Sequence, residues 1–233
     1  MSNRKTVLVT GATGSIGEAC ARYFHENGYF VYIHYRSQEA KAKELKQELP
    51  RSEIISFDIA NRDDVHAKLE NLNIDVLVNN AGITRDQLFF WMSDDEWHDV
   101  IDTSVNGTYN VTKSVMKNMI TNKSGAIVNV ASVSGLIGNA GQTNYSAAKG
   151  AMIAFTKALS MEVARYKIRV NAVAPGIILS EMTKDLDVKS LKKDIPLRRL
   201  GKPEEVAECV YFLGEKASYV TGEVLNISGG FVR

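Results

Sequence analysis

The sequence predicts a doubly wound α/β fold. Short runs of apolar and β-branched residues alternate with longer amphipathic segments along all 233 residues. Such apolar runs are typical of strands that are buried on both faces, as in a parallel sheet covered by helices. Hydrophobic residues make up 45% of the chain, enough for one sizeable core, and no linker rich in Pro or Gly divides it. We therefore expect a single domain over residues 1–233.

Seven apolar runs are expected to form strands, and six amphipathic segments to form helices. The expected strands are Val7–Val9, Phe30–Tyr35, Ile54–Phe57, Ile74–Val78, Ala126–Val130, Ile168–Val173 and Glu223–Ile227. The expected helices are Ile16–Asn27, Gln38–Leu49, Arg62–Leu69, Asp94–Ile120, Asn144–Tyr166 and Pro203–Leu213. Right-handed crossovers between successive strands leave few topologies open.

A glycine-rich turn follows the first expected strand and opens the first helix. It reads Thr10-Gly11-Ala12-Thr13-Gly14-Ser15-Ile16-Gly17. Glycines let the backbone turn tightly and approach a pyrophosphate, and the N–H groups at the start of the helix point at that anion. An ordinary turn between a strand and a helix does not need three glycines in seven residues. We therefore expect a nucleotide site here.

The end of the second strand indicates which nicotinamide cofactor binds. An NAD site places Asp or Glu there to accept hydrogen bonds from the ribose 2′-hydroxyl. Here the strand ends in Tyr35-Arg36-Ser37, with no acid until Glu39. A guanidinium and a hydroxyl suit the 2′-phosphate of NADP, unless Arg36 is simply a solvated surface residue. Asp58, after the third strand, is placed either to contact the adenine amine or to serve as a turn residue.

The helical stretch 144–149 carries a tyrosine and a lysine on one face. Tyr145 and Lys149 are four residues apart, so their side chains lie about 6 Å apart along the helix axis. The ordinary pKa of a phenol is about 10. The ammonium of Lys149 and a positively charged nicotinamide should lower the pKa of Tyr145 toward neutrality. Tyr145 could then give or take a proton at a hydroxyl or ketone oxygen.

Polar or glycine-containing sequences also end several strands at one edge of the expected sheet. Ser132 follows the fifth strand and is placed to hydrogen-bond a substrate oxygen near Tyr145, unless it is only a turn hydroxyl. Asn79-Asn80-Ala81-Gly82 ends the fourth strand, and Pro175-Gly176 ends the sixth. Ligands of open α/β sheets bind at the carboxyl ends of the strands, so we expect the cofactor cleft at this edge.

The segment after the sixth strand is expected to form a lid. Residues 176–202 show weak periodicity and many charges. A disordered insert is one reading of this pattern. Its position after a strand end suits a lid over the substrate site, at about residues 177–200.

Together these motifs resemble those of the short-chain dehydrogenases/reductases over essentially the full length. They are Thr10–Gly17, Asn79–Gly82, Ser132, Tyr145 with Lys149, and Pro175-Gly176. The resemblance implies a Rossmann-type sheet of seven parallel strands in the order 3-2-1-4-5-6-7, with helices on both faces, usually in a homotetramer. It also implies a fourth catalytic residue, Asn106, which would hold a water molecule that links the catalytic lysine to bulk solvent.

The resemblance further implies NADP(H) as the cofactor and a set of residues that contact it. These are Gly11, Thr13, Ser15, Ile16, Gly17, Arg36, Ser37, Asp58, Ile59, Asn80, Ala81, Gly82, Tyr145, Lys149, Pro175, Gly176, Ile178 and Ser180. Ser180 stands where a threonine commonly contacts the nicotinamide carboxamide, and it keeps the hydroxyl.

Within the family, several stretches are similar to 3-oxoacyl-[acyl-carrier-protein] reductases: Asn80–Asp86, Gly138–Tyr145, Pro196–Gly201 and Tyr219–Glu223. Ser56–Arg62 is similar to ketoreductases of aryl-polyene-type pathways. The resemblance implies NADPH-dependent reduction of a 3-oxoacyl thioester, bound to acyl carrier protein, in fatty-acid or polyene biosynthesis. The carrier would dock on basic residues near the site, here Lys123 and Arg165-Tyr166-Lys167, unless these form a solvated face.

The chain departs from the family pattern at three points. Its glycines stand at positions 11, 14 and 17, whereas the family usually has the second glycine at position 15, occupied here by Ser15. Gly14 replaces a basic residue often found there, which removes one phosphate contact. The segment between Asp58 and Asn79 is short, so we expect one covering helix to be trimmed.

Three other functions compete with this one. A reductase of another carbonyl, such as acetoacetyl-CoA, a sugar or a steroid, would differ mainly in the lid. A sugar-nucleotide epimerase or dehydratase is suggested by the glycine spacing, but needs an added substrate domain for which we expect no room. A non-catalytic NADP-binding protein would typically lack Tyr145 or Lys149, and both are present.

Composition excludes several classes of partner. The net charge of +1 gives no global attraction to nucleic acid or to an anionic membrane. No apolar stretch reaches the roughly 18 residues of a membrane span, and no signal peptide fits, so we expect a cytoplasmic protein. Cys20 and Cys209 fit no metal or redox spacing, and the four histidines share none with each other, so we expect no metal site.

Overall fold

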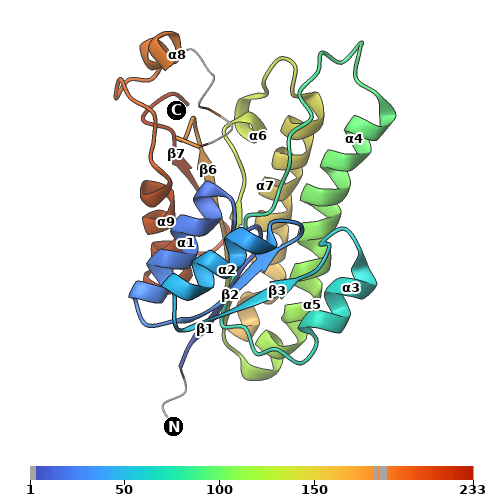
Figure 1. Cartoon of the computed structure of the whole chain (residues 1–233), viewed down its shortest axis with the longest axis vertical. Helices are drawn as coiled ribbons and strands as arrows, with labels where there is room; N and C mark the ends of the chain where they lie inside the picture. The colour runs from blue at the N-terminus through green and yellow to red at the C-terminus, as the bar shows by residue number, and fades with distance from the viewer. Residues whose placement is uncertain (1–3, 181–182, 184–187, 233) are drawn as a thin grey trace.

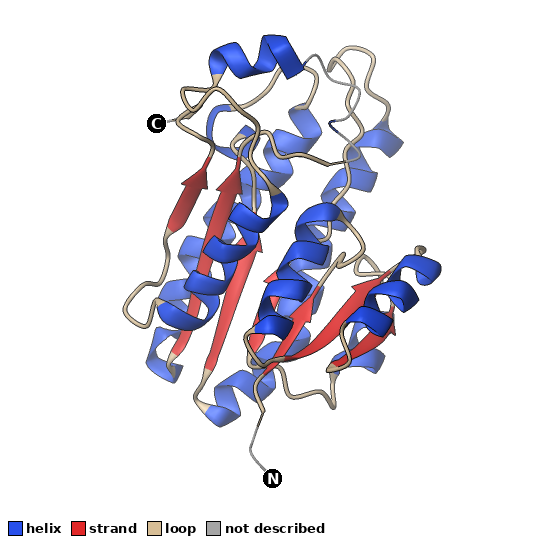
Figure 2. Ribbon diagram, turned by 60° about the vertical axis from the view of Figure 1, so that its left-hand side comes forward, coloured by secondary structure: helices blue, strands red, loops and turns tan. Residues whose placement is uncertain are grey.

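A computed structural model describes residues 4–180, 183 and 188–232, with only the backbone described at 188–190. Its seven strands form one parallel sheet in the order β3-β2-β1-β4-β5-β6-β7, which confirms the predicted fold (Figure 2). The strands are β1 Thr6–Val9, β2 Phe30–Tyr35, β3 Ser52–Ser56, β4 Val76–Asn79, β5 Gly125–Val130, β6 Ile168–Pro175 and β7 Val224–Ile227.

The centre of the sheet explains where a ligand can bind. Val7 of β1 pairs with Val31 of β2 on one side and with Val76 of β4 on the other. The chain therefore runs outward through β2 and β3 and then crosses back over β1 to start β4. In doubly wound sheets, ligands bind at the carboxyl ends of the strands where the strand order reverses, which here is between β1 and β4.

Helices cover both faces of the sheet. They are α1 Ser15–Glu26, α2 Glu39–Glu48, α3 Arg62–Leu69, α4 Asp94–Ile101, α5 Gly107–Asn122, α6 Ser134–Ile137, α7 Thr143–Val163, α8 Val188–Asp194 and α9 Pro203–Tyr211. One core packs α1, α2 and α9 on the sheet around Phe24 and Val31. The other packs α3, α5 and α7 around Leu69 and Ile127. Figure 1 shows α6 and α8 at one end of the molecule and the N-terminus at the other.

The expected helix 94–120 is divided by a turn of π-helix. α4 ends at Ile101, the π-helical turn spans Asp102–Asn106, and α5 begins at Gly107. A side chain at Gly107 would meet Ile59 Cγ1 at 2.6 Å, so the glycine lets α5 pack closely on the segment after β3. A π-helical turn inserts one residue and rotates the side chains that follow, and such turns are frequent at functional sites.

Other differences from prediction are short elements. α6 has four residues and α8 has seven, and both lie in segments expected to be loop or lid. The short α3 of eight residues agrees with the expected trimming. No helix within the described ranges is long and apolar enough to cross a membrane.

Candidate active site

The glycine-rich turn after β1 is held in a conformation that only glycine adopts easily. Gly11 has φ of +62°, and a side chain there would meet Ala81 Cα at 2.9 Å. A side chain at Gly17 would collide with Gly11 O and would meet Asn80 Nδ2 at 2.6 Å. By contrast, a side chain at Gly14 would meet nothing closer than 3.5 Å. The open side of the turn thus faces the start of α1, where a phosphate fits.

The loop after β4 ties this turn in place. Asn80 Nδ2 donates to Thr10 O at 2.9 Å and to Gly11 O at 3.0 Å. Thr10 Oγ1 accepts from the backbone N–H groups of Asn80 and Ala81. Asn80 therefore anchors the turn, as expected of an amide at a strand end. Any direct contact of Asn80 with a cofactor stays a prediction.

His34 on β2 supports the same turn and was missed by the sequence analysis. Gly11 N–H donates to His34 Nδ1 at 3.0 Å, and Ala12 N–H donates to His34 O at 2.9 Å. The other ring nitrogen, Nε2, lies 3.0 Å from Phe57 O. Because Nδ1 accepts, Nε2 must carry the proton and donate, so the ring is neutral. Burial lowers the pKa of His34 to about 4.

The residues predicted to select the cofactor lie at the carboxyl ends of β2 and β3. Arg36 and Ser37 are exposed, and Arg36 forms no ion pair with any carboxylate of the described residues. Asp58 Oδ1 accepts from Ala60 N–H at 3.0 Å, so Asp58 also stabilises its own turn. Ile59 is buried under Gly107. Binding of a 2′-phosphate by the guanidinium of Arg36 stays a prediction.

The structure brings Ser132, Tyr145 and Lys149 together. Lys149 Nζ lies 5.5 Å from the centre of the Tyr145 ring and donates to Val130 O at 2.8 Å. Ser132 follows β5 and accepts from Ser134 N–H at 3.1 Å. A side chain at Gly135 would meet the carbonyl carbon of Lys149 at 2.6 Å, so the segment after β5 presses closely on α7.

Asn144 fixes the start of α7 beside Tyr145. It is fully buried, and its Nδ2 donates to Arg85 O and to Glu96 O, each at 3.0 Å. Its Oδ1 accepts from Tyr145 N–H at 2.7 Å. One amide therefore links the loop after β4, the start of α4 and the residue that would transfer the proton.

The pKa values of the pair are set by burial. Burial raises the pKa of Tyr145, and the hydroxyl of Ser132 opposes part of that rise. Burial also lowers the pKa of Lys149 to about 8. The predicted fall in the pKa of Tyr145 is therefore not seen in the protein alone, because burial of the phenolate outweighs the hydrogen bond from Ser132. The part of the prediction that depends on a charged nicotinamide remains untested.

The structure does not bring Asn106 to this group. Its side chain is exposed, and its Nδ2 donates to Asp102 Oδ1 at 2.7 Å. The expected water relay through Asn106 therefore lacks the contact with Lys149 that it requires. The π-helical turn is the physical reason, because it places Ser104 on the buried side and Asn106 on the solvent side.

The end of the sixth strand lies against the segment after β5 and the segment after β7. Pro175 O accepts from Val133 N–H at 3.0 Å, and a side chain at Gly176 would meet Ser228 Cα at 2.9 Å. Ile178 is buried, and Ser180 N–H donates to Thr183 Oγ1. The remaining lid residues 181–182 and 184–187 lie outside the described residues.

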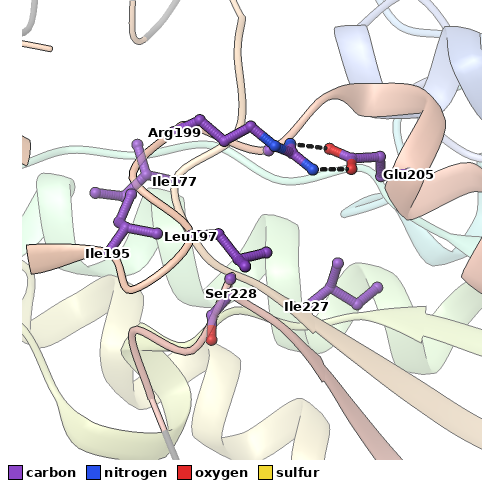
Figure 3. A pocket seen from close by; sticks show the side chains of 9 residues that line it. Ile177, Ile195, Leu197, Arg199, Glu205, Ile227 and Ser228 are labelled. Atoms are coloured by element: carbon purple, nitrogen blue, oxygen red, sulfur yellow. Dashed lines mark hydrogen bonds and ion pairs between the residues drawn. The ribbon is translucent and has the colours of Figure 1, made fainter. Parts of the chain in front are cut away.

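The far end of the lid is fastened by an ion pair. Arg199 donates to Glu205 at 2.7 and 2.6 Å, in a two-point contact (Figure 3). This contact holds the pKa of Glu205 at about 2. A cavity of about 100 Å³ lies beside it, lined by Ile177, Ile195 and Leu197 among others. This cavity is too small for a nicotinamide, and Ser132, Tyr145 and Lys149 do not line it. The cavity therefore lies apart from the cluster of Ser132, Tyr145 and Lys149.

No group of three or more His, Cys, Asp or Glu side chains in the described part of the chain could hold a metal ion. Cys20 is buried, and burial raises its pKa to about 12, so its thiol is unreactive. Ser132, Tyr145 and Lys149 bring a hydroxyl, a phenol and an ammonium group together at the site. Such a set suits proton transfer beside a bound nicotinamide.

Comparison with known proteins gives matches over nearly the whole chain. A sequence model of the family described as enoyl-(acyl carrier protein) reductase matches residues 11–232. The 3-oxoacyl-[acyl-carrier-protein] reductase FabG of Chlamydia trachomatis is 45% identical over 97% of this chain and 96% of that protein. The FabG of Staphylococcus aureus is 40% identical over 99% of both chains. Nodulation protein G of Rhizobium meliloti is 42% identical over 99% of this chain and 97% of that protein.

Proposed function

The chain belongs to the short-chain dehydrogenase/reductase family, and from this membership we propose that it is an NADPH-dependent 3-oxoacyl-[acyl-carrier-protein] reductase. The observation that carries the proposal is the cluster of Ser132, Tyr145 and Lys149 at the carboxyl edge of the sheet. Relatives that are 40–45% identical over nearly their full length bear the name of this activity. The product would be the 3-hydroxyacyl thioester of fatty-acid or polyene biosynthesis.

The residues divide the chemistry of ketone reduction between them. A bound NADPH would supply the hydride that adds to the carbonyl carbon. Ser132 would hold the carbonyl oxygen by a hydrogen bond, and Tyr145 would give that oxygen its proton. Lys149 would stabilise the phenolate left on Tyr145, because its ammonium lies against the same ring. One hydride and one proton together convert the ketone to the alcohol.

The matched family model is described as an enoyl reductase, and this description raises a second candidate activity. In that activity the group reduced would be an enoyl group and not a 3-oxo group. The hydroxyl groups of Ser132 and Tyr145 could bind either a ketone oxygen or the thioester oxygen that gains charge in enoyl reduction. We favour the ketone because the FabG relatives are named 3-oxoacyl reductases. An enoyl thioester belongs in the assay as the competing substrate.

An apolar rim beside the site favours an acyl substrate over a sugar. Gln87 N–H donates to Gly141 O at 2.8 Å, so the loop after β4 lies against the loop that leads into α7. That loop exposes Phe89, Phe90 and Trp91, and Phe90 is 83% exposed. Such side chains could pack against the hydrocarbon chain of an acyl substrate, and among the three only Trp91 carries a hydrogen-bond donor for a polyhydroxylated ring.

The basic residues expected to dock the carrier lie elsewhere. Lys123 precedes β5, and Arg165 and Lys167 precede β6, so all three lie at the amino edge of the sheet. Ser132 and Pro175 lie at the opposite edge. Within one chain these residues do not border the site, which corrects the expectation. The preference for acyl carrier protein therefore rests on the relatives alone.

The α5–α7 face supports the proposed homotetramer. A groove of about 710 Å³ runs between these helices and is lined by Tyr109, Met116, Phe155 and Met161 among others. Met161 is 77% exposed. A second copy of the chain would cover this apolar face. Light scattering should then report a mass several times the 25.7 kDa of one chain, and a monomeric mass would remove this part of the proposal.

The cytoplasmic location of the protein stays a prediction.

The proposed function is tested by following NADPH oxidation with four substrates under the same conditions: a 3-oxoacyl-acyl-carrier protein, acetoacetyl-CoA, a crotonyl thioester and a sugar ketone. We expect fastest turnover on the carrier-bound 3-oxoacyl thioester. Fast turnover on the crotonyl thioester alone would establish the enoyl activity instead. No turnover on any thioester would move the substrate to another class of carbonyl.

Cofactor choice is tested at Arg36. Replacing Arg36 with alanine should weaken NADPH binding about 10- to 100-fold, because hydrogen bonds to a charged group contribute about 1.5–3 kcal/mol. NADH lacks the 2′-phosphate and serves as the internal control, so its Kd should stay within about twofold. Fluorescence titration gives both constants. An equal loss of affinity for both cofactors would show that Arg36 supports the fold of the loop and does not bind the 2′-phosphate.

A further inference from the structure

The buried ammonium of Lys149 is held by two acceptors of unequal strength. Its Nζ donates to Val130 O at 2.8 Å and to Met152 Sδ at 3.6 Å. Lys149 is 3% exposed and Met152 is 1% exposed, so bulk water cannot replace the sulfur at the ammonium. A thioether is a weak acceptor, but its polarisable sulfur interacts more strongly with a charge inside a protein than in water. The sulfur therefore adds to the stabilisation that the carbonyl provides.

Helical spacing places the sulfur on the same face of α7 as the proposed proton donor. Tyr145, Lys149 and Met152 stand at positions i, i+4 and i+7 of this helix. The Lys149 ammonium lies 5.5 Å from the centre of the Tyr145 ring and 3.6 Å from the Met152 sulfur. One face of α7 thus carries the phenol, the cation and a sulfur that contacts the cation.

Buried hydrogen bonds fix Met152 in its turn. Thr156 Oγ1 donates to Met152 O at 2.8 Å, and the same hydroxyl accepts from Asn129 Nδ2 at 2.8 Å. Asn129 directly precedes Val130 on β5, and the carbonyl of Val130 is the other acceptor of the ammonium. One buried amide therefore anchors both acceptors, the first through the chain and the second through Thr156.

The charged groups around the ammonium do not neutralise it. In the part of the chain that the structure describes, no carboxylate forms an ion pair with Lys149. The groups that face the pair are the Tyr145 phenol on α7, the Ser132 hydroxyl after β5, and Asp86 in the loop after β4, whose charge acts on Tyr145. Burial alone lowers the pKa of Lys149 to about 8. A weak acceptor should matter more here than beside a lysine that a carboxylate already stabilises.

We propose that Met152 is a positioning residue for the ketone reduction, whose sulfur keeps the Lys149 ammonium charged and in place beside the Tyr145 ring. The inference rests on the proposed function, because in that reaction the ammonium stabilises the phenolate left when Tyr145 has given its proton. A hydrocarbon side chain of similar volume would fill the same space without accepting a hydrogen bond. Lys149 would then lose its proton at lower pH, since removing an acceptor favours the neutral amine.

Met152→Leu and Met119→Leu form a matched pair of variants. Each replaces a buried thioether by a hydrocarbon of similar volume, which usually costs little stability. Met119 packs on Gly125 at the amino end of β5, away from the site. The alkaline fall in kcat should begin about 0.5–1 pH unit lower in Met152→Leu than in wild type. At pH well below this fall both variants should match wild type, because the ammonium is charged in all three proteins.

Met152→Gln tests the opposite direction. Its amide oxygen is a stronger acceptor than a thioether, so the alkaline fall in kcat should begin at higher pH than in wild type. A purely structural role for Met152 would lower kcat at every pH and would not move the profile in opposite directions in the two variants. An unchanged alkaline fall in both variants, or the same displacement in Met119→Leu, would overturn the inference.

NMR of protein labelled with ¹³C at the methionine methyl groups tests the contact without any substrate. The Met152 signal, identified by its absence from Met152→Leu or Met152→Gln, should shift with pH with a midpoint of about 8, where Lys149 titrates. This shift should vanish in Lys149→Gln, and the Met119 signal should show none. A Met152 signal that does not respond to Lys149 contradicts the inference even if the thioester is reduced rapidly. Wild-type protein that reduces no thioester refutes the proposed function instead, and the methyl titration still reports on the contact.

Discussion

Replacing Tyr145 with phenylalanine should lower kcat for ketone reduction by about 10²- to 10⁴-fold, the usual contribution of a positioned proton donor. The variant loses only the phenolic O–H, which in the proposed reaction is the proton source for the developing alkoxide. The phenyl ring can keep its place beside Lys149, whose Nζ lies 5.5 Å from the ring centre. Affinity for NADPH should therefore change by less than about threefold. Stopped-flow absorbance and fluorescence titration measure the two quantities separately.

The matched control is Tyr219→Phe. Tyr219 is fully exposed in the turn before β7 and lies outside every site described above, so it should keep the wild-type rate. If Tyr145→Phe reduced the ketone as fast as wild type, proton transfer would have to come from another group. If instead both kcat and NADPH affinity collapsed, the tyrosine would be needed for the shape of the site.

Most of the fold was predictable because parallel strands leave a strong pattern. The strands at Val7–Val9 and Ala126–Val130 are buried on both faces. They therefore appear in the sequence as nearly continuous apolar runs, which are easy to recognise. Boundaries shifted by one or two residues, as at β3, which begins at Ser52. The four-residue α6 could not be predicted, because one helical turn is too short to show a period.

The catalytic pair was predictable for a different reason. Tyr145 and Lys149 are joined by one turn of a long helix, so sequence spacing alone fixes their relative position. Ser132 needed only the rule that ligands bind at the carboxyl ends of strands. Local geometry therefore accounts for the part of the site that the sequence analysis found.

Residues that act across the fold were not predictable in the same way. The segment around Asp102–Asn106 has the composition of an ordinary helix, and its sequence does not indicate a π-helical turn. The resemblance selected Asn106 by residue type, while the turn rotates Ser104 inward. His34 was missed because a single histidine in an apolar strand is more often structural than functional. Its contact with Gly11 spans 23 positions of sequence.

The free energy of unfolding should fall by about 3 kcal/mol through His34 when the pH is lowered from about 6.5 to 4. The ring is 2% exposed, and burial is the main cause of its low pKa. Above pH 6.5 the histidine is neutral in both the folded and the unfolded chain, so it adds no pH dependence. Between pH 6.5 and 4, His34 binds a proton in the unfolded chain but stays neutral in the folded chain. The free energy of unfolding therefore declines over this range. Below pH 4 both states are protonated and the loss is complete.

The groups around His34 do not reverse this sign. The backbone carbonyl of Phe57 and the carboxylates of Asp58 and Asp64 favour the protonated ring, while Arg36 opposes it. Their sum leaves the pKa well below its ordinary value because none of them replaces the water lost on burial. Protonation would also convert Nδ1 from an acceptor into a donor facing Gly11 N–H, and two donors cannot bond to each other.

Urea unfolding at pH 7, 5.5 and 4.5 tests this prediction in wild type, His34→Asn and His66→Gln. An asparagine carbonyl can accept from Gly11 N–H but cannot titrate, so His34→Asn should lose most of the decline with pH, even if it is less stable throughout. His66 is exposed on α3, so the His66→Gln variant should keep the wild-type slope.

NADPH affinity should weaken over the same pH range in wild type, because the turn that we expect to receive the pyrophosphate depends on the neutral ring of His34. Equal slopes in wild type and His34→Asn would show that other groups govern acid sensitivity and that the phosphate turn does not depend on the charge of His34.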